Sequence, residues 1–209
     1  MLHAQENVSP KSNFKDGVYE QAKQFFSNNP TQSTSAWMKL FTQSNSEQNI
    51  VKIGAQTIAD FEQDGIDLNN AWGICLNKIP YIRLRDTAFY GKGDMVFVRL
   101  YVVGNLCYYY HKTESIQEVI MNIYNPLTQQ QIGRKPIANR KKIMSQSVFR
   151  FGEDKILPFT ETILSNYLKD DEKVYNTWKA LPKPISQEQL FKLLLVYNDR
   201  NPIQFLPIE

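Results

Sequence analysis

Apolar, β-branched and aromatic residues gather in short runs over residues 72–112, and Asn, Gly and Pro separate the runs. The runs cover residues 72–76, 79–84, 95–103 and 106–111. Runs of this length with turn residues between them are typical of consecutive antiparallel strands. Asn77 and Lys78 fill the two positions between the first two runs, which predicts a two-residue hairpin loop. We therefore expect an antiparallel sheet with its centre at residues 72–111.

Residues 95–103 have no polar face. Phe97, Arg99 and Tyr101 alternate with Val98, Leu100 and Val102, so apolar side chains occupy both sides of the predicted strand. Strands of this kind are buried on both faces. In the last run Tyr109 faces away from Tyr108 and Tyr110, because successive strand residues point to opposite faces.

The segments around this sheet give mixed signals. Residues 19–27 have apolar side chains at helical spacing, with Asp16 as a plausible N-cap. Residues 50–53, 58–61 and 148–151 are predicted as short strands. Residues 115–124 have helical spacing but are rich in β-branched residues, so helix and strand both stay open. Residues 129–142 are polar and basic, which favours a loop or lid.

The C-terminal third changes to a helical period. Thr160 can cap a helix that runs to about Leu168, residues 172–181 form a second apolar face, and Ser186 begins a capping box. These patterns predict an α+β fold with a mostly antiparallel β-sheet core and C-terminal helices packed on one face. Residues 1–16 are expected to be a disordered tail, and residues 17–209 a single α+β domain.

Length and charge exclude several classes. A chain of 209 residues buries roughly 70% of its unfolded surface, so it needs no metal or disulfide to fold. The net charge of +3 is too small to indicate a nucleic-acid partner. The absence of any run of 18 apolar residues predicts no membrane-spanning helix.

The first residues resemble the end of an export signal. Cleavage after Ala4 would leave Gln5 as the mature start, so residues 1–16 could include a signal-peptide remnant. The basic region and apolar segment that precede such a site are missing from this sequence. A plain cytoplasmic tail is the alternative, whereas the signal reading predicts a periplasmic or secreted protein.

Residues for catalysis or metal binding are scarce. The chain has two histidines, and His111 stands without a nucleophile motif. Zinc needs three or four His or Cys ligands, and the scarcity of these residues argues against such a site, so no metal or other cofactor is expected. Asp60, Glu62 and Asp64 imitate the start of a calcium loop, but Ala71 occupies the position of its bidentate Glu. An acidic turn is the simpler interpretation.

Cys75 and Cys107 are the only cysteines and both lie in predicted strands. An oxidising compartment would allow them to form a disulfide. Free cysteines in apolar strands also behave as small buried hydrophobes. Both interpretations stay open.

Two groups of residues are candidate binding sites. Tyr108, Tyr110 and His111 form the outer end of a strand, where aromatic side chains could contact a ligand. A basic cluster could bind anions, although a solvated loop is its ordinary role. Its members are Arg134, Lys135, Arg140, Lys141 and Lys142.

Short segments in a fixed order carry a family resemblance. They are residues 16–19, 25–26, 28–30, 71–75, 81–82, 102–104, 106–109, 168–171 and 196–202. In this order they resemble a group of exported proteins of unknown function from Bacteroides-type bacteria. The resemblance implies export and a β-rich core followed by C-terminal helices. The group has no assigned activity, so no site residue carries over.

These observations favour a non-catalytic module of the periplasm or cell surface that binds a protein or a small-molecule ligand. The alternatives are a hydrolase that uses carboxylates such as Asp60, Glu62 or Asp64, and a purely structural component of the envelope. The sequence leaves the partner and the oligomeric state open.

Overall fold

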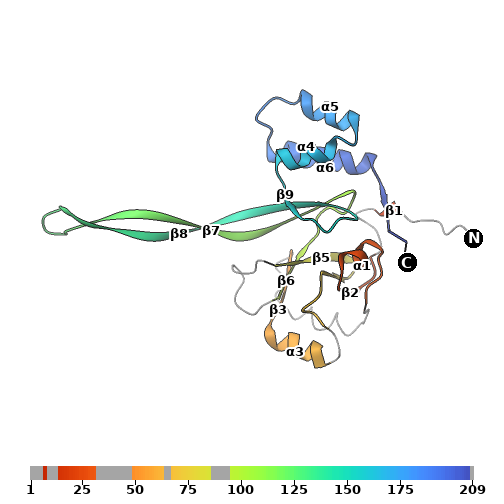
Figure 1. Ribbon diagram of the computed structural model, residues 1–209, viewed down its shortest axis with the longest axis horizontal. Coiled ribbons are helices and arrows are strands. Elements are labelled where there is room, and N and C mark those ends of the chain that lie inside the picture. Colours follow the sequence, from red (N-terminus) through yellow and green to blue (C-terminus); the bar gives the residue numbers. More distant parts are fainter. Residues whose placement is uncertain (1–6, 9–13, 32–48, 64–66, 86–94, 208–209) are drawn as a thin grey trace, which may run out of the picture. The chain divides into compact units, whose positions relative to one another are not determined.

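The computed structural model describes residues 7–8, 14–31, 49–63, 67–85 and 95–207. The chain forms two compact units (Figure 1). The first consists of Met1–His111 and Gln146–Glu209, and the second of Lys112–Ser145. Asp64, which is part of the predicted acidic turn, lies outside the described residues.

The first unit contains a five-stranded antiparallel sheet. Its strands, in spatial order, are β2 (Gly17–Tyr19), β4 (Gly73–Leu76), β5 (Ile79–Leu84), β6 (Met95–Arg99) and β3 (Ile50–Ile53). The loop between β4 and β5 is the predicted two-residue hairpin, and Asn77 and Lys78 both have positive φ, at 52° and 63°. Turns of this kind match the twist of the strands that they join.

Apolar side chains cover both faces of this sheet. On β6, Val96 and Val98 belong to one core cluster, and Met95 and Phe97 to the cluster on the other face. The prediction that this strand is buried on both sides is confirmed. The strand is shorter than predicted, because it ends at Arg99 and Val102 forms only an isolated bridge with Tyr108.

Helix α3 (Ala55–Gln63) contributes Ile58 and Phe61 to the second of these clusters. The prediction of a strand at residues 58–61 is therefore wrong. Ile58 and Phe61 are three residues apart, a spacing that places both on one helix face. Short apolar segments of this kind fit either period.

A second sheet contains β7 (Leu106–Tyr124), β8 (Gln131–Arg150) and β9 (Leu157–Pro158). Within the first unit its side chains alternate between two cores. Leu106, Tyr108 and Val148 pack with the C-terminal helices. Cys107, Tyr109 and Phe149 pack against the five-stranded sheet. The predicted opposite orientation of Tyr109 is confirmed.

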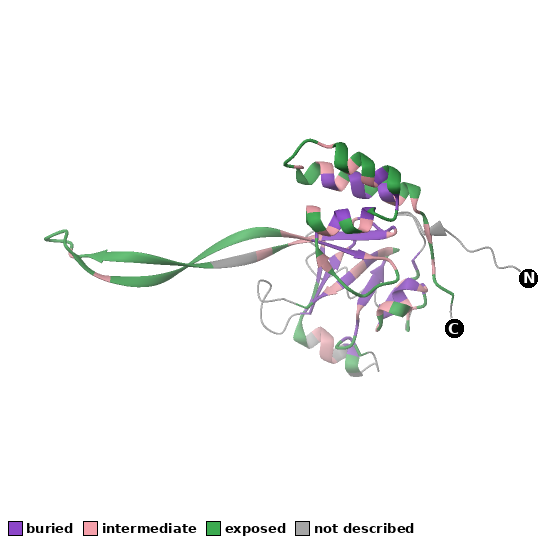
Figure 2. Cartoon of the chain, turned by 45° about the horizontal axis from the view of Figure 1, so that its top comes forward, coloured by how far each residue is buried: buried purple, intermediate pink, exposed green. Residues whose placement is uncertain are grey.

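Three C-terminal helices cover the outer face of this second sheet within the first unit (Figure 2). They are α4 (Glu161–Leu168), α5 (Glu172–Ala180) and α6 (Gln187–Arg200). The hydroxyl of Thr160 accepts a hydrogen bond from Ile163 N, and Ser186 and Gln189 form the predicted capping box. Leu164, Leu168 and Leu194 are fully buried beneath them. The predicted α+β fold, with a mostly antiparallel sheet and C-terminal helices on one face, is confirmed.

The N-terminal segment adds two short elements. Helix α1 (Ala22–Phe26) lies within the predicted helix, but its N-cap is Gln21 instead of Asp16. Asp16 accepts a hydrogen bond from Lys78 N at 2.8 Å, so it supports the β4–β5 turn. Within the predicted tail, β1 (Asn7–Val8) pairs with β10 (Ile203–Gln204), and Phe14 is buried in the core.

The second unit is a β-hairpin formed by the remaining parts of β7 and β8. Its turn closes where Asn125 N donates to Gln130 O at 2.8 Å and Asn125 Oδ1 accepts from Leu127 N. The strand alternative for residues 115–124 is correct and the helical one is wrong. The loop predicted at residues 129–142 is also wrong. The side chains that the structure describes at residues 117–144 are mostly exposed on both faces, so burial imposes no alternation on the sequence.

Candidate functional site

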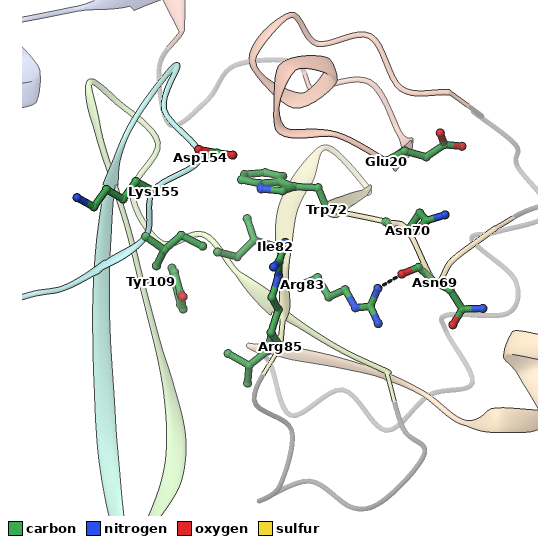
Figure 3. A pocket seen from close by; sticks show the side chains of 13 residues that line it. Glu20, Asn69, Asn70, Trp72, Ile82, Arg83, Arg85, Tyr109, Asp154 and Lys155 are labelled. Atoms are coloured by element: carbon green, nitrogen blue, oxygen red, sulfur yellow. Dashed lines mark hydrogen bonds between the residues drawn. The ribbon is translucent and has the colours of Figure 1, made fainter.

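A cavity of about 970 Å³ opens in the first unit between the β4–β5 hairpin and the β8–β9 connection (Figure 3). Thirteen described residues line it. They come from the end of β2, the segment before β4, the end of β5, strand β7 and the connection to β9. Volumes of roughly 300–1,000 Å³ are typical of sites for small organic ligands.

Trp72 forms the aromatic part of the cavity wall. Its backbone is fixed on both sides, because Trp72 N donates to Tyr19 O at 2.8 Å and Arg83 N donates to Trp72 O at 2.9 Å. The half-buried indole packs on Phe25, with 4.9 Å between the ring centroids. Such anchoring places a rigid aromatic surface at the cavity at little entropic cost.

Tyr109 reaches the same cavity from β7. Burial raises the pKa of its phenol, and a hydrogen bond with Ser147 acts in the opposite direction. The hydroxyl therefore stays neutral in the ordinary pH range. Ile82, Leu84 and Ile156 complete the apolar lining.

Arg83 in β5 and Arg85 directly after the strand occupy alternate positions of the chain. Arg83 Nη1 donates a hydrogen bond to Asn69 O, and Arg85 is exposed. Burial, and next the positive charge of Arg85, lower the pKa of Arg83, while Asp67 raises it. An anion placed between the two guanidinium groups would relieve their repulsion. Lys155 adds a third cation from the β8–β9 connection.

Acidic and amide groups complete the polar lining. Asn69 and Asn70 are held by Asp67, whose carboxylate accepts hydrogen bonds from Asn69 N at 2.8 Å and Asn70 Nδ2 at 2.7 Å. Glu20 and Asp154 supply two carboxylates. Among the described lining residues there is no Ser, Thr, Cys or His.

The predicted aromatic site falls largely outside this cavity. Tyr108 is buried against Phe159 and Phe191, with ring centroids 5.0 and 5.2 Å away. Tyr110 stacks on Tyr101, and the Tyr110 hydroxyl donates to the Tyr101 hydroxyl at 2.6 Å.

His111 is half-buried, and its ring centroid lies 6.0 Å from that of Tyr109. The strand thus presents Tyr109 to the cavity, whereas Tyr108 packs with the helices.

The predicted anion-binding residues Arg134, Lys135, Arg140, Lys141 and Lys142 lie on β8 in the second unit. All five are exposed. They are therefore strand residues of a hairpin and contribute nothing to the cavity of the first unit.

Glu62 is not among the described residues that line the cavity, although it contacts one of them. Glu62 is exposed on α3 and accepts a hydrogen bond from Asn69 Nδ2 at 2.5 Å. Asp60 is part of the same helix, and Asp64 falls outside the described residues. Within the described part of the chain, no three His, Cys, Asp or Glu side chains are grouped so that they could hold a metal ion.

Both cysteines are free and buried. Cys75 Sγ donates to Asp16 Oδ1 at 3.4 Å, and Cys107 Sγ donates to Gly104 O at 3.5 Å. The disulfide alternative is not realised in this structure.

Comparisons of the chain with protein-family models, curated proteins and solved structures found no match. In the described residues, no helix has the length and apolar character needed to cross a membrane.

Trp72, Arg83, Arg85 and Tyr109 are among the cavity residues that the sequence pattern did not propose as site residues. A usable signal exists for the first two. A two-residue turn at Asn77 and Lys78 continues the β4–β5 register outward until Trp72 lies opposite Arg83. Nothing in the pattern relates Tyr109 to this hairpin, because the second sheet packs on the first through tertiary contacts alone.

Proposed function

We propose that this protein is a non-catalytic binding module whose cavity takes a small organic anion with an aromatic or apolar body. The observation that carries the proposal is the pairing of the Trp72 and Tyr109 rings with the cations Arg83, Arg85 and Lys155 around one cavity. Such a lining fits a compound that combines an apolar ring with a negative charge. Aromatic carboxylates, sulfonates and phosphates combine the two.

The apolar wall supplies contact area. Trp72 and Ile156 have apolar surface exposed to water, and its burial by a ligand would be favourable. The planar guanidinium groups of Arg83 and Arg85 can each hold two oxygens of one anionic group. Burial is the main cause of the lowered pKa of Arg83, and the positive charge of Arg85 is the second cause, which a bound anion would balance.

Binding without turnover is favoured over hydrolysis by the composition of the lining. The carboxylates at the cavity are Glu20 and Asp154, and neither belongs to the acidic group Asp60, Glu62 and Asp64 on which the hydrolase alternative rests. A location in the periplasm or at the cell surface is part of the same proposal. It rests only on the resemblance to exported proteins and on the Ala4–Gln5 ending.

The test uses 8-anilinonaphthalene-1-sulfonate, an aromatic sulfonate whose fluorescence rises in apolar surroundings. Its neutral analogue N-phenyl-1-naphthylamine has the same aromatic body without the anion. We expect the full chain to bind the sulfonate more tightly than the neutral compound. Arg85→Gln should weaken binding of the sulfonate at least about tenfold and leave binding of the neutral compound unchanged, as expected for one charged hydrogen bond.

Lys141→Gln is the matched control, because it removes one exposed cation from the second unit. It should leave both affinities unchanged. Trp72→Leu should weaken both compounds. Equal affinity for the sulfonate in the parent chain, Arg85→Gln and Lys141→Gln would contradict the proposal.

A further inference from the structure

The charged residues of the second unit all lie outside the segment that contains its turn. Residues 112–145 contain six Lys or Arg and two Glu residues, a net charge of +4 in a chain whose total is +3. Residues 119–133 contain no charged residue, and the hairpin turn lies within them. Glu118 precedes this uncharged segment on β7 and Arg134 follows it on β8.

The same uncharged segment exposes large apolar side chains on both faces of the hairpin. Val119, Met121 and Ile123 alternate with Ile120 and Tyr124 along β7, and all five are exposed. Ile120 is 67% exposed, Ile132 on β8 65%, and Leu127 in the turn 92%. We call residues 119–133 the hairpin tip.

Behind the tip, β8 carries positive charge only. Within the second unit its five cations are Arg134, Lys135, Arg140, Lys141 and Lys142, all exposed, and residues 131–150 include no Asp or Glu. The strand thus passes from an uncharged apolar end to a basic stretch within a few residues.

We infer that the hairpin tip inserts into the interface of an anionic phospholipid bilayer while the basic residues of β8 lie against the headgroups. A protein partner would cover one face or one edge of the hairpin. Lipid surrounds an inserted element, and this matches apolar exposure on both faces and at the turn. The negative headgroups complement the five cations behind the tip.

The polar residues of the tip limit the depth of insertion. Asn122, Asn125 and Gln129 keep hydrogen-bonding groups there, and a two-stranded hairpin leaves backbone groups unpaired along its edges. Such groups are not tolerated in the hydrocarbon interior without partners. The tip therefore rests at the level of headgroups and upper acyl chains, where Tyr124 is well suited to lie.

The test is co-sedimentation of the full chain with vesicles of phosphatidylcholine alone or of equimolar phosphatidylcholine and phosphatidylglycerol. We expect binding to the anionic vesicles and at least tenfold weaker binding to the neutral ones. Lys141→Gln together with Lys142→Gln should weaken binding to anionic vesicles about 25-fold, because each cation near the surface contributes about fivefold. Raising the salt concentration should have a similar effect.

Variants of the tip separate insertion from simple adsorption. Ile120→Ser together with Leu127→Ser should weaken binding at least tenfold without unfolding, because both side chains are exposed. Lys173→Gln together with Lys192→Gln is the matched control, since it removes two exposed charges from the first unit. It should leave vesicle binding within a factor of two. In a Leu127→Trp variant, brominated lipids should quench more fluorescence than in the parent chain.

Three results would overturn the inference. Equal binding to neutral and anionic vesicles would show that the protein does not recognise anionic headgroups. Unchanged binding of the tip variant would reduce the interaction to adsorption by charge. Absence of vesicle binding, with a dimer that the tip variant converts to a monomer, would assign the hairpin to a second copy of the chain.

Discussion

Asn198 on helix α6 bonds to the backbone of Leu106 on β7 in the manner of a neighbouring strand. Its side-chain Oδ1 accepts from Leu106 N at 2.8 Å, and its Nδ2 donates to Leu106 O at 2.9 Å. One carboxamide thus satisfies both backbone groups of a fully buried residue at the start of the second sheet. This contact links helix α6 to strand β7, which the helix covers.

Asn198→Asp should destabilise the protein by about 1–3 kcal/mol, because Leu106 O would lose its donor and meet a carboxylate oxygen. Urea denaturation followed by circular dichroism measures this loss. The control is Asp199→Asn, an exposed change one residue away that should stay within about 0.5 kcal/mol of the parent. Equal midpoints for the two variants would contradict the role assigned to Asn198.

Gly104→Ala should also destabilise the protein, since an added Cβ would lie 2.5 Å from Cγ of Asn198. Truncation of Asn198 removes that clash, so the destabilisation by Gly104→Ala depends on the residue at position 198. In the Asn198→Ala background the cost of Gly104→Ala should fall by about 1 kcal/mol or more. A double-mutant cycle measured in urea checks this, and additive costs would show that the clash is absent.

Asp171 should make the protein sensitive to acid. Its carboxylate caps α5 and accepts hydrogen bonds from Arg200 Nε at 2.7 Å and from Asn201 Nδ2 at 3.2 Å. The hydrogen bond from Arg200 is the main cause that lowers its pKa from 3.8 to about 2. The unfolded chain therefore takes up this proton first as the pH falls, and the stabilisation present above about pH 4 is lost toward pH 2.

Melting temperatures across that pH range check the assignment. The parent chain should lose more stability between pH 4 and pH 2 than Asp171→Asn, which cannot titrate at this position. At neutral pH the variant should be the less stable of the two. Parallel pH profiles for both proteins would exclude Asp171 as the group responsible.

Lys78→Gly should stabilise the protein by about 0.5–1 kcal/mol. Lys78 has φ of 63°, a conformation that costs an L side chain energy and that glycine adopts freely. Lys78→Ala is the matched control, because it removes the same side chain but keeps the Cβ, so it should bring no gain. Thermal unfolding of the three proteins ranks them, and a glycine variant no better than the alanine variant would refute the prediction.

Cys75 and Cys107 should be slow to react in the folded protein. Burial raises the pKa of both thiols, to about 12 for Cys107, so little reactive thiolate forms. Without reductant, Ellman's reagent should detect two thiols in denaturant and react slowly without it. Thr162→Cys, at an exposed helix position, should add one fast thiol. Absence of both thiols in denaturant would point to the disulfide instead.

The sequence predicted the elements whose periodicity reflects burial. Three predicted features pack against neighbouring elements, so the spacing of their apolar residues reflects burial in a core. They are the hairpin with its turn at Asn77 and Lys78, the strand β6 that is buried on both faces, and the capped helices after Thr160 and Ser186. The hairpin of residues 112–145 was missed as a unit because its exposed faces impose no period on strands β7 and β8.

The cavity was less predictable than the fold. Tyr108 and Tyr110 were selected for their position at a strand end, although alternation alone could not say which face would meet a cavity. Trp72 and Arg83 meet across a short hairpin, whereas Tyr109 reaches them only through packing of two sheets. Contacts between two packed sheets leave no local pattern in the sequence.

The strand that carries Tyr108 and Tyr109 connects the helix-covered core to the cavity wall through one peptide bond. Any movement of Tyr108 against Phe159 and Phe191 shifts the backbone from which Tyr109 projects. Under the proposed binding function, ligand occupancy on one side is expected to be linked to helix packing on the other. Substitutions beneath the C-terminal helices are then expected to change the affinity without contacting the ligand.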